Sequence, residues 1–174
     1  MATYELIAKT TLGSDAKDIT LSNIPQTGYT DLVLLASSRA TRSGQVEAGM
    51  ALTFNGDTSS IYSYRRLAGE GNTVNSASAS AIGYVFIGRN TGASATANTF
   101  TSTEIYIPNY AGSANKSFSS TSVHETNATV AYINCIAGLW ASTSAITSIT
   151  LFDTESGSNL LSGSSFYLFG ITKS

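Results

Sequence analysis

Near the end of the sequence lies the stretch Ser165-Phe166-Tyr167-Leu168-Phe169-Gly170-Ile171. Successive side chains of an extended strand point to opposite faces, so Phe166 and every second residue after it share one face. Tyr167 and every second residue after it share the other face. Aromatic and β-branched residues on both faces are typical of a strand inside a sheet, and this stretch therefore predicts one.

The same period of two recurs along the chain and predicts an all-β fold. A short continuous apolar run at residues 31–36 favours a strand buried on both faces, because the run is too short for a helix. Further strands are predicted at residues 4–9, 18–21, 50–54, 82–87, 100–107, 117–123, 130–140 and 145–152. No segment has the apolar stripe of an amphipathic helix.

Stretches rich in small and polar residues separate the predicted strands. We expect loops at residues 39–48, 69–80 and 88–99, where Gly, Asn, Ser and Ala cluster. Residues 61–67 fit either a strand or one helical turn. Asn55-Gly56-Asp57 is a strong signal for a tight turn, most economically the turn of a hairpin.

About eight to ten short strands at this spacing are typical of a sandwich. We therefore predict an antiparallel β-sandwich with jelly-roll-like connections, in a single domain that spans residues 1–174. An immunoglobulin-like Greek key is the second choice, although one cysteine does not supply the disulfide of antibody domains. No repeat of about 20–50 residues is present, which argues against a propeller or a solenoid.

The composition excludes several classes of protein. Charged residues make up 11% of the 174 residues, against about 25% in an ordinary soluble domain. The formal charge of −2 leaves no basic surplus for nucleic acid, and one histidine with one cysteine does not suffice for a zinc site. No apolar run is long enough to insert into a membrane. Met1–Glu5 lacks the features of a signal peptide, so we expect synthesis in the cytoplasm.

Serine and threonine take the place of the missing charges, with 27 and 23 residues. Charge normally keeps a protein soluble and protects the edges of its sheets. A surface of uncharged hydroxyl groups therefore suits a protein whose edges are covered in an assembly.

No catalytic or metal-binding motif stands out. His124 lacks a nucleophile or an orienting carboxylate in a known pattern, so we predict a structural role for it. Cys135 lies in the middle of a predicted strand, where we predict a small, buried, apolar side chain. Asp153, Glu155 and Asn159 place oxygen atoms in one loop without the spacing of an EF-hand, and a turn explains them better. We therefore predict no catalytic residue, no cofactor and no metal.

Aromatic residues near predicted strand ends are the candidates for contact with a sugar or a protein partner. Exposed tyrosine and tryptophan stack on sugar rings and anchor interfaces. Packing in the core is the commoner role for any single one of them. The five candidates are Tyr62, Tyr64, Tyr106, Tyr110 and Trp140.

Five stretches, distributed over nearly the whole chain, carry a resemblance to a known family. They are Ser22–Leu34, Leu52–Asp57, Glu104–Gly112, Ala137–Trp140 and Ser165–Ile171, and they consist of turns, a hairpin and strand ends. In these stretches the chain resembles small virion proteins of tailed bacteriophages, especially those of marine and cyanobacterial hosts. The resemblance implies a non-enzymatic module that is displayed on the outside of the virion.

Proteins of this kind decorate capsids or form parts of tails and fibres, usually as oligomers. Heptads and shaft repeats are missing, which favours a capsid decoration or cement protein, or a small tail accessory, over a whole fibre. The partners that the resemblance implies are further copies of the chain, as a homo-trimer, and other virion proteins. The alternative is a tail-fibre tip or lectin-like module that binds a host-surface glycan; a polysaccharide hydrolase is least favoured.

Overall fold

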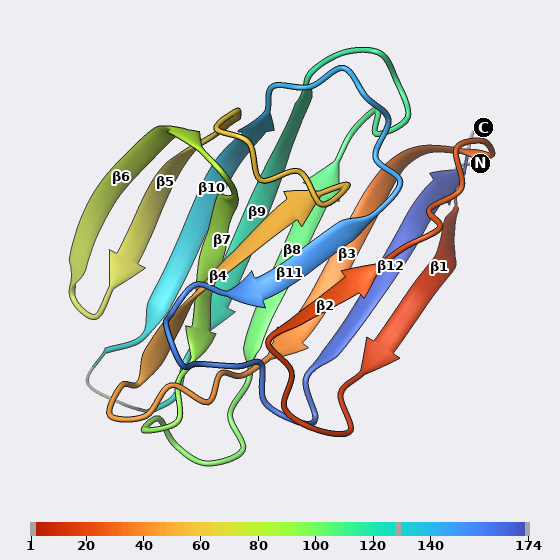
Figure 1. The fold of residues 1–174 in the computed structure, drawn as a ribbon. Coiled ribbons are helices and arrows are strands. Elements are labelled where there is room, and N and C mark those ends of the chain that lie inside the picture. The colour runs from red at the N-terminus through yellow and green to blue at the C-terminus, as the bar shows by residue number, and fades with distance from the viewer. Residues whose placement is uncertain (1–2, 128–129, 173–174) are drawn as a thin grey trace.

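The computed structural model describes residues 3–127 and 130–172 and consists of two packed antiparallel sheets (Figure 1). The predicted all-β sandwich is confirmed. Twelve strands are present rather than eight to ten, in one sheet of eight strands and one of four. Within the described ranges no helix is long and apolar enough to cross a membrane.

The two sheets draw their strands from all parts of the chain. In spatial order the large sheet contains β1 (Tyr4–Thr11), β12 (Ser165–Thr172), β3 (Tyr29–Ser38), β8 (Thr101–Ile107), β9 (Lys116–His124), β10 (Tyr132–Trp140), β5 (Tyr62–Glu70) and β6 (Thr73–Ile82). The small sheet contains β2 (Asp18–Leu21), β11 (Ile149–Asp153), β4 (Glu47–Phe54) and β7 (Val85–Thr91).

The hydrophobic core lies between the two sheets. Strands β8, β9 and β10 alternate buried and exposed residues almost without exception, because one face meets the small sheet and the other meets solvent. In β12, Phe166 and Leu168 point into the core as their spacing predicts. An aromatic cluster of Phe54, Phe118 and Trp140 fills one part of it, with ring centroids 5.4 and 5.6 Å apart.

Strand β5 begins at Tyr62, so residues 62–67 take the strand option of the two that their sequence allows. Most of the predicted loop at residues 69–80 differs from its prediction, because it forms the end of β5 and strand β6. The residues of β6 have low strand propensity, but they pair one to one with β5 from Ser63–Ser80 to Glu70–Thr73. Tertiary pairing therefore overrides local propensity here.

The tight turn predicted after β4 is present but does not close a hairpin. Asn55 and Gly56 both have positive φ, 54° and 67°, and the Asp57 amide donates to the Phe54 carbonyl at 2.9 Å. Strands β4 and β5 on either side of the turn belong to different sheets. The turn therefore passes the chain from the small sheet to the large one.

The small sheet covers only part of the large one. Its edge strand β7 packs mainly against β9 and β10, whereas β6 extends beyond it (Figure 1). No residue of β6 is buried. The face of the large sheet that points away from the small sheet has no covering layer among the described residues.

Candidate functional site

We call this uncovered side of the eight-stranded sheet the outer face. The strand register aligns its side chains in rows that cross all eight strands. One such row is Lys9, Tyr167, Leu35, Glu104, Thr121, Cys135, Leu67 and Ser76. These residues lie far apart in the sequence, and only the pairing of strands brings them to one surface.

Large apolar side chains gather on the outer face. Ten of them are exposed among the described residues, and nine point outward from this sheet. The nine are Tyr4, Leu6, Leu35, Leu67, Val74, Tyr106, Val123, Ile133 and Tyr167. The tenth, Tyr84, contacts Phe152 of the small sheet, with ring centroids 5.6 Å apart. Single exposed apolar residues are ordinary, but their concentration on one face makes this face the candidate interaction surface.

Charge is sparse on the outer face. Of its described strand residues only four are charged, two basic and two acidic: Lys9, Arg65, Asp31 and Glu104. Small hydroxyl residues such as Ser119 and Thr121 occupy much of the space between the apolar side chains. A surface of this kind loses little hydration energy when a partner covers it, because few charges have to be desolvated.

A shallow groove of about 400 Å³ runs over β5, β10 and β9 on this face. Its floor is formed by short side chains, among them Ser119, Cys135 and Ala137, and Leu67 and Arg65 stand beside it. Cys135 is exposed here, which differs from the buried position predicted for it. The reason is the phase of β10, whose odd-numbered residues point outward.

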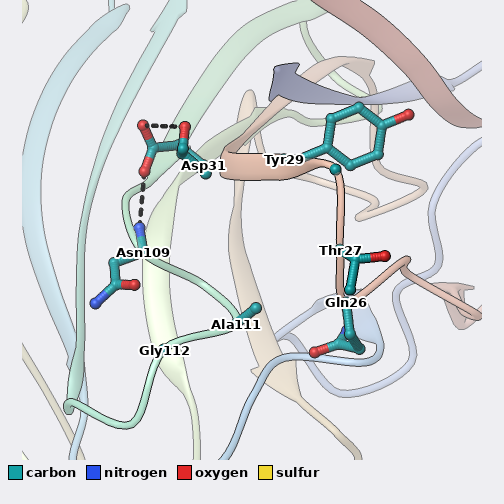
Figure 2. A pocket seen from close by; sticks show the side chains of 9 residues that line it. Gln26, Thr27, Tyr29, Asp31, Asn109, Ala111 and Gly112 are labelled. Carbon is teal, nitrogen blue, oxygen red and sulfur yellow. Dashed lines mark hydrogen bonds between the residues drawn. The ribbon is translucent and has the colours of Figure 1, made fainter. Parts of the chain in front are cut away.

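A second hollow of about 370 Å³ lies at one end of the sandwich, between residues 26–31 and the loop that joins β8 to β9 (Figure 2). We call it the end cleft. Its polar side chains include those of Gln26, Thr27, Asp31 and Asn109. These residues carry no local signal of a site in the sequence, because the two segments meet only in the folded protein.

Hydrogen bonds fix the polar groups of the end cleft. Asp31 Oδ1 accepts from the backbone N–H of Asn109 at 2.8 Å, and Asp31 Oδ2 accepts from the Tyr106 hydroxyl at 3.0 Å. Gln26 Nε2 donates to the Ile24 and Ile146 carbonyls, which leaves the Gln26 amide oxygen for other partners. Burial, followed by the bond to Asp31, raises the pKa of Tyr106.

The five predicted contact residues do not form one site. Tyr62, Tyr110 and Trp140 are buried in the core, where an outside ligand does not reach them, and Tyr64 is half-buried against Phe86. Only Tyr106 is exposed, on the outer face beside the end cleft. Position near a strand end did not reveal on which face of the sheet each side chain lies.

Trp140 and Tyr62 stabilise the turn after β4 from inside the core. Trp140 Nε1 donates to Asp57 Oδ2 at 2.9 Å, and the Tyr62 hydroxyl donates to the Asp57 carbonyl at 3.0 Å. Hydrogen bonds from Ser59, and then the one from Trp140, lower the pKa of Asp57. Burial raises the pKa of Tyr62 to about 12. The Asp57 carboxylate is therefore engaged within the fold.

His124 is buried, and neither of its ring nitrogens has a hydrogen-bond partner. Burial, and after it the nearby Arg89 guanidinium, lower its pKa to about 4, so the ring is neutral near pH 7. Its ring lies 5.3 Å from that of Tyr132. Glu125 is exposed on the opposite side of the strand, as the alternation predicts.

The acidic loop after β11 forms a turn. Asp153 Oδ1 accepts from the backbone N–H of Glu155 at 2.8 Å, and the backbone N–H of Asn159 donates to Thr41 Oγ1 at 2.9 Å. Burial raises the pKa of Asp153 to about 6. Across residues 3–127 and 130–172 no three or more His, Cys, Asp or Glu side chains are grouped to hold a metal ion.

No family model and no curated protein matches the sequence. Among solved structures, two of scytalido-glutamic peptidase with transition-state analogues are 13% identical, with TM-scores of 0.25 and 0.24, over 92% of this chain. This chain spans 66% of the length of those peptidase chains. The CBM2 module of the evolved Dit of Lactobacillus casei BL23 phage J-1 is 8% identical, with a TM-score of 0.21, over 97% of this chain and 77% of the module.

These neighbours correct one prediction. The expectation that the protein is not an enzyme is contradicted, because two of the similar structures are those of a peptidase. Likenesses with TM-scores of 0.21 to 0.25 transfer no activity and no residue roles to this chain. The phage module is likewise a weak likeness in overall shape.

Proposed function

We propose that the protein is a structural component of the outside of a tailed-phage virion, as a capsid decoration or cement protein or a small tail accessory. The observation that carries this proposal is the outer face, where nine large apolar side chains stand among hydroxyl residues. The resemblance of the sequence to phage virion proteins is the reason for proposing a tailed-phage virion as the particle.

The dimensions of the outer face suit a protein–protein contact. Eight strands about 4.8 Å apart make a surface roughly 34 Å wide. With strands of seven to ten residues, its area is roughly 800–1,100 Å², which is at least the share of one partner in an interface of standard size. Low charge and high apolar content are the composition expected at the centre of such an interface.

A matched pair of tyrosines allows a test of this surface. Tyr167 lies on the outer face and Tyr84 on the other side of the molecule, and the two are 37% and 39% exposed. Phage that carries Tyr167→Ser should incorporate several-fold less of this protein into purified particles than phage that carries Tyr84→Ser. Gold-labelled antibody on intact virions should mark the head if the protein is a decoration or cement protein, and the tail if it is an accessory.

Two results would contradict the proposal. One is an absence of label on virions from cells in which the protein is made. The other is equal incorporation of the two serine variants, which would show that the outer face does not attach the protein to the particle.

The end cleft favours a second function, the binding of a host-surface glycan. Polar side chains fixed by hydrogen bonds beside an exposed tyrosine are the groups that bind sugars. Asn109→Gly removes the Asn109 amide side chain and tolerates its positive φ of 48°, and Asn98→Gly is the control on another loop, with φ 61°. This function would be supported if the wild type bound a glycan on an array, Asn109→Gly abolished that binding and Asn98→Gly retained it. An array on which the wild type gives no signal would exclude the function for the glycans tested.

A further inference from the structure

Strand β6 forms one edge of the large sheet, and its outer edge pairs with no described strand. It extends over ten residues, Thr73–Ile82, or about 33 Å. The side of its backbone away from β5 therefore presents a long row of N–H and C=O groups. Such an edge is a template for pairing with another chain.

Proteins normally protect a free edge, and the opposite edge of this sheet is protected. Strand β1 carries Glu5 and Lys9, and its register shifts between Leu6 and Ala8. Charges and bulges of this kind prevent the addition of a further strand. Strand β6 has none of them over Thr73–Ser80: it contains no charged residue and no proline, and its only register shift lies at its end.

Strand β6 is also held in place as a strand. Asn75 on its inner side donates to Glu70 at 2.7 Å and accepts from Arg66 at 2.5 Å. Tyr132 of β10 donates to the other oxygen of Glu70 at 2.6 Å. This network joins β6 to β5 and β10, so the free edge is ordered before any partner arrives.

We propose that β6 pairs with β6 of a second copy, antiparallel about a two-fold axis, so that the two large sheets become continuous. Side chains that meet across such a pair come from alternating serine and alanine, which are small and uncharged. The nearest charges on the outer face, Arg65 of each copy, lie one strand behind the edge and so three strand spacings, about 14 Å, apart. That exceeds the Debye length of about 8–10 Å, so these charges do not oppose pairing.

The dimer gains both hydrogen bonds and apolar burial. Val74 is the most exposed large apolar residue described, at 77%, and it stands at the end of a row with Val123 and Ile133. A strand added beside it covers part of its surface. Pairing along a single strand buries less area than a standard interface, so we expect a dimer that forms at micromolar concentration and strengthens where copies are crowded.

The test uses purified protein and one charge at the edge. Sedimentation from low to high micromolar concentration should show a monomer–dimer equilibrium for the wild type. Ser78→Lys should remain monomeric, because Ser78 lies near the middle of β6 and the two lysines then come close together beside the two-fold axis. A mixture of Ser78→Lys and Ser78→Glu should restore the dimer. Ser119→Lys, in the same row of the outer face but on the interior strand β9, is the control and should dimerise as the wild type does.

A second measurement locates the contact in the wild type itself. Amide hydrogen exchange should slow over Thr73–Ser80 as the concentration rises, and should not change over β1. The proposal would be overturned by a wild type that stays monomeric or that has the mass of three copies. It would also be overturned if Ser119→Lys abolished the dimer and Ser78→Lys left it intact. These results do not depend on virions, so failure here is distinct from failure of the proposed location.

Discussion

The pH dependence of stability contains two opposing contributions, one from His124 and one from Asp153. Both side chains are buried, and burial favours the neutral form of each. The pKa of His124 falls from 6.5 to about 4 on folding. The pKa of Asp153 rises from 3.8 to about 6 on folding. The two groups therefore titrate over nearly the same range of pH with opposite effects.

The sign of each contribution follows from which state binds the proton. Between about pH 6.5 and pH 4 the unfolded chain protonates His124 and the folded chain does not, so this group lowers stability as the pH falls. Between about pH 6 and pH 3.8 the folded chain protonates Asp153 and the unfolded chain does not, so this group raises stability as the pH falls. Each shift exceeds two pKa units, which corresponds to about 3 kcal/mol across its range.

Two substitutions separate the contributions. Urea unfolding, followed by the fluorescence of the buried Trp140, gives the free energy of unfolding at pH 7 and pH 4. From pH 7 to pH 4, the free energy of unfolding of His124→Gln should rise by about 3 kcal/mol relative to that of the wild type. Over the same interval, the free energy of unfolding of Asp153→Asn should fall by about 3 kcal/mol relative to that of the wild type. Comparison with the wild type removes the contributions of the other ionisable groups. In the double variant, the change in the free energy of unfolding between pH 7 and pH 4 should match that of the wild type to within about 1 kcal/mol.

Single variants whose free energies of unfolding both run parallel to that of the wild type between pH 7 and pH 4 would contradict this prediction. Such a result would mean that neither group is desolvated in the folded protein as its burial requires. A shift of the two variants in the same direction would contradict the assigned signs.

Two further predictions concern the core. Gly138→Ala places a Cβ atom inside van der Waals contact of the Phe118 ring and should lower the free energy of unfolding by about 2 kcal/mol in urea titrations. Gly13→Ala, which meets no atom within 4 Å, is the control and should change the free energy of unfolding little. Trp140→Phe removes the donor to Asp57 and should destabilise the protein by about 2 kcal/mol, measured by circular dichroism. It should also raise the pKa of the Asp57 carboxyl, measured by NMR; an unchanged Asp57 pKa would contradict the role given to the indole.

The alternation of side chains identified much of the fold correctly. The segments of β12 and β10 were predicted as strands, and the two faces of β12 were assigned as the structure has them, because a period of two is a local property of an extended chain. The turn at Asn55-Gly56 was also predictable, since Asn and Gly tolerate the positive φ that it needs. The strands that this turn connects in space were not predictable, because the turn joins the two sheets rather than two strands of a hairpin.

The candidate site was much less predictable. Trp140 and Tyr110 lie near strand ends, as exposed binding residues often do, yet both are buried because the opposite sheet covers their side of β10 and the loop after β8. The end cleft joins Asp31 to Asn109, which are distant in sequence, through one hydrogen bond. Neither fact has a local signature.

By itself, the sequence determined the class of fold, the faces of its most regular strands and a surface poor in charge. The tertiary structure alone decided that Thr73–Ile82 is a strand with a free edge, and that nine apolar side chains share one face. The physical reason is that alternation along a strand is set by neighbouring residues, whereas a row across a sheet is set by which strands pair and in what register. In this chain that pairing brings Leu6 of β1 and Val74 of β6 to opposite ends of one surface.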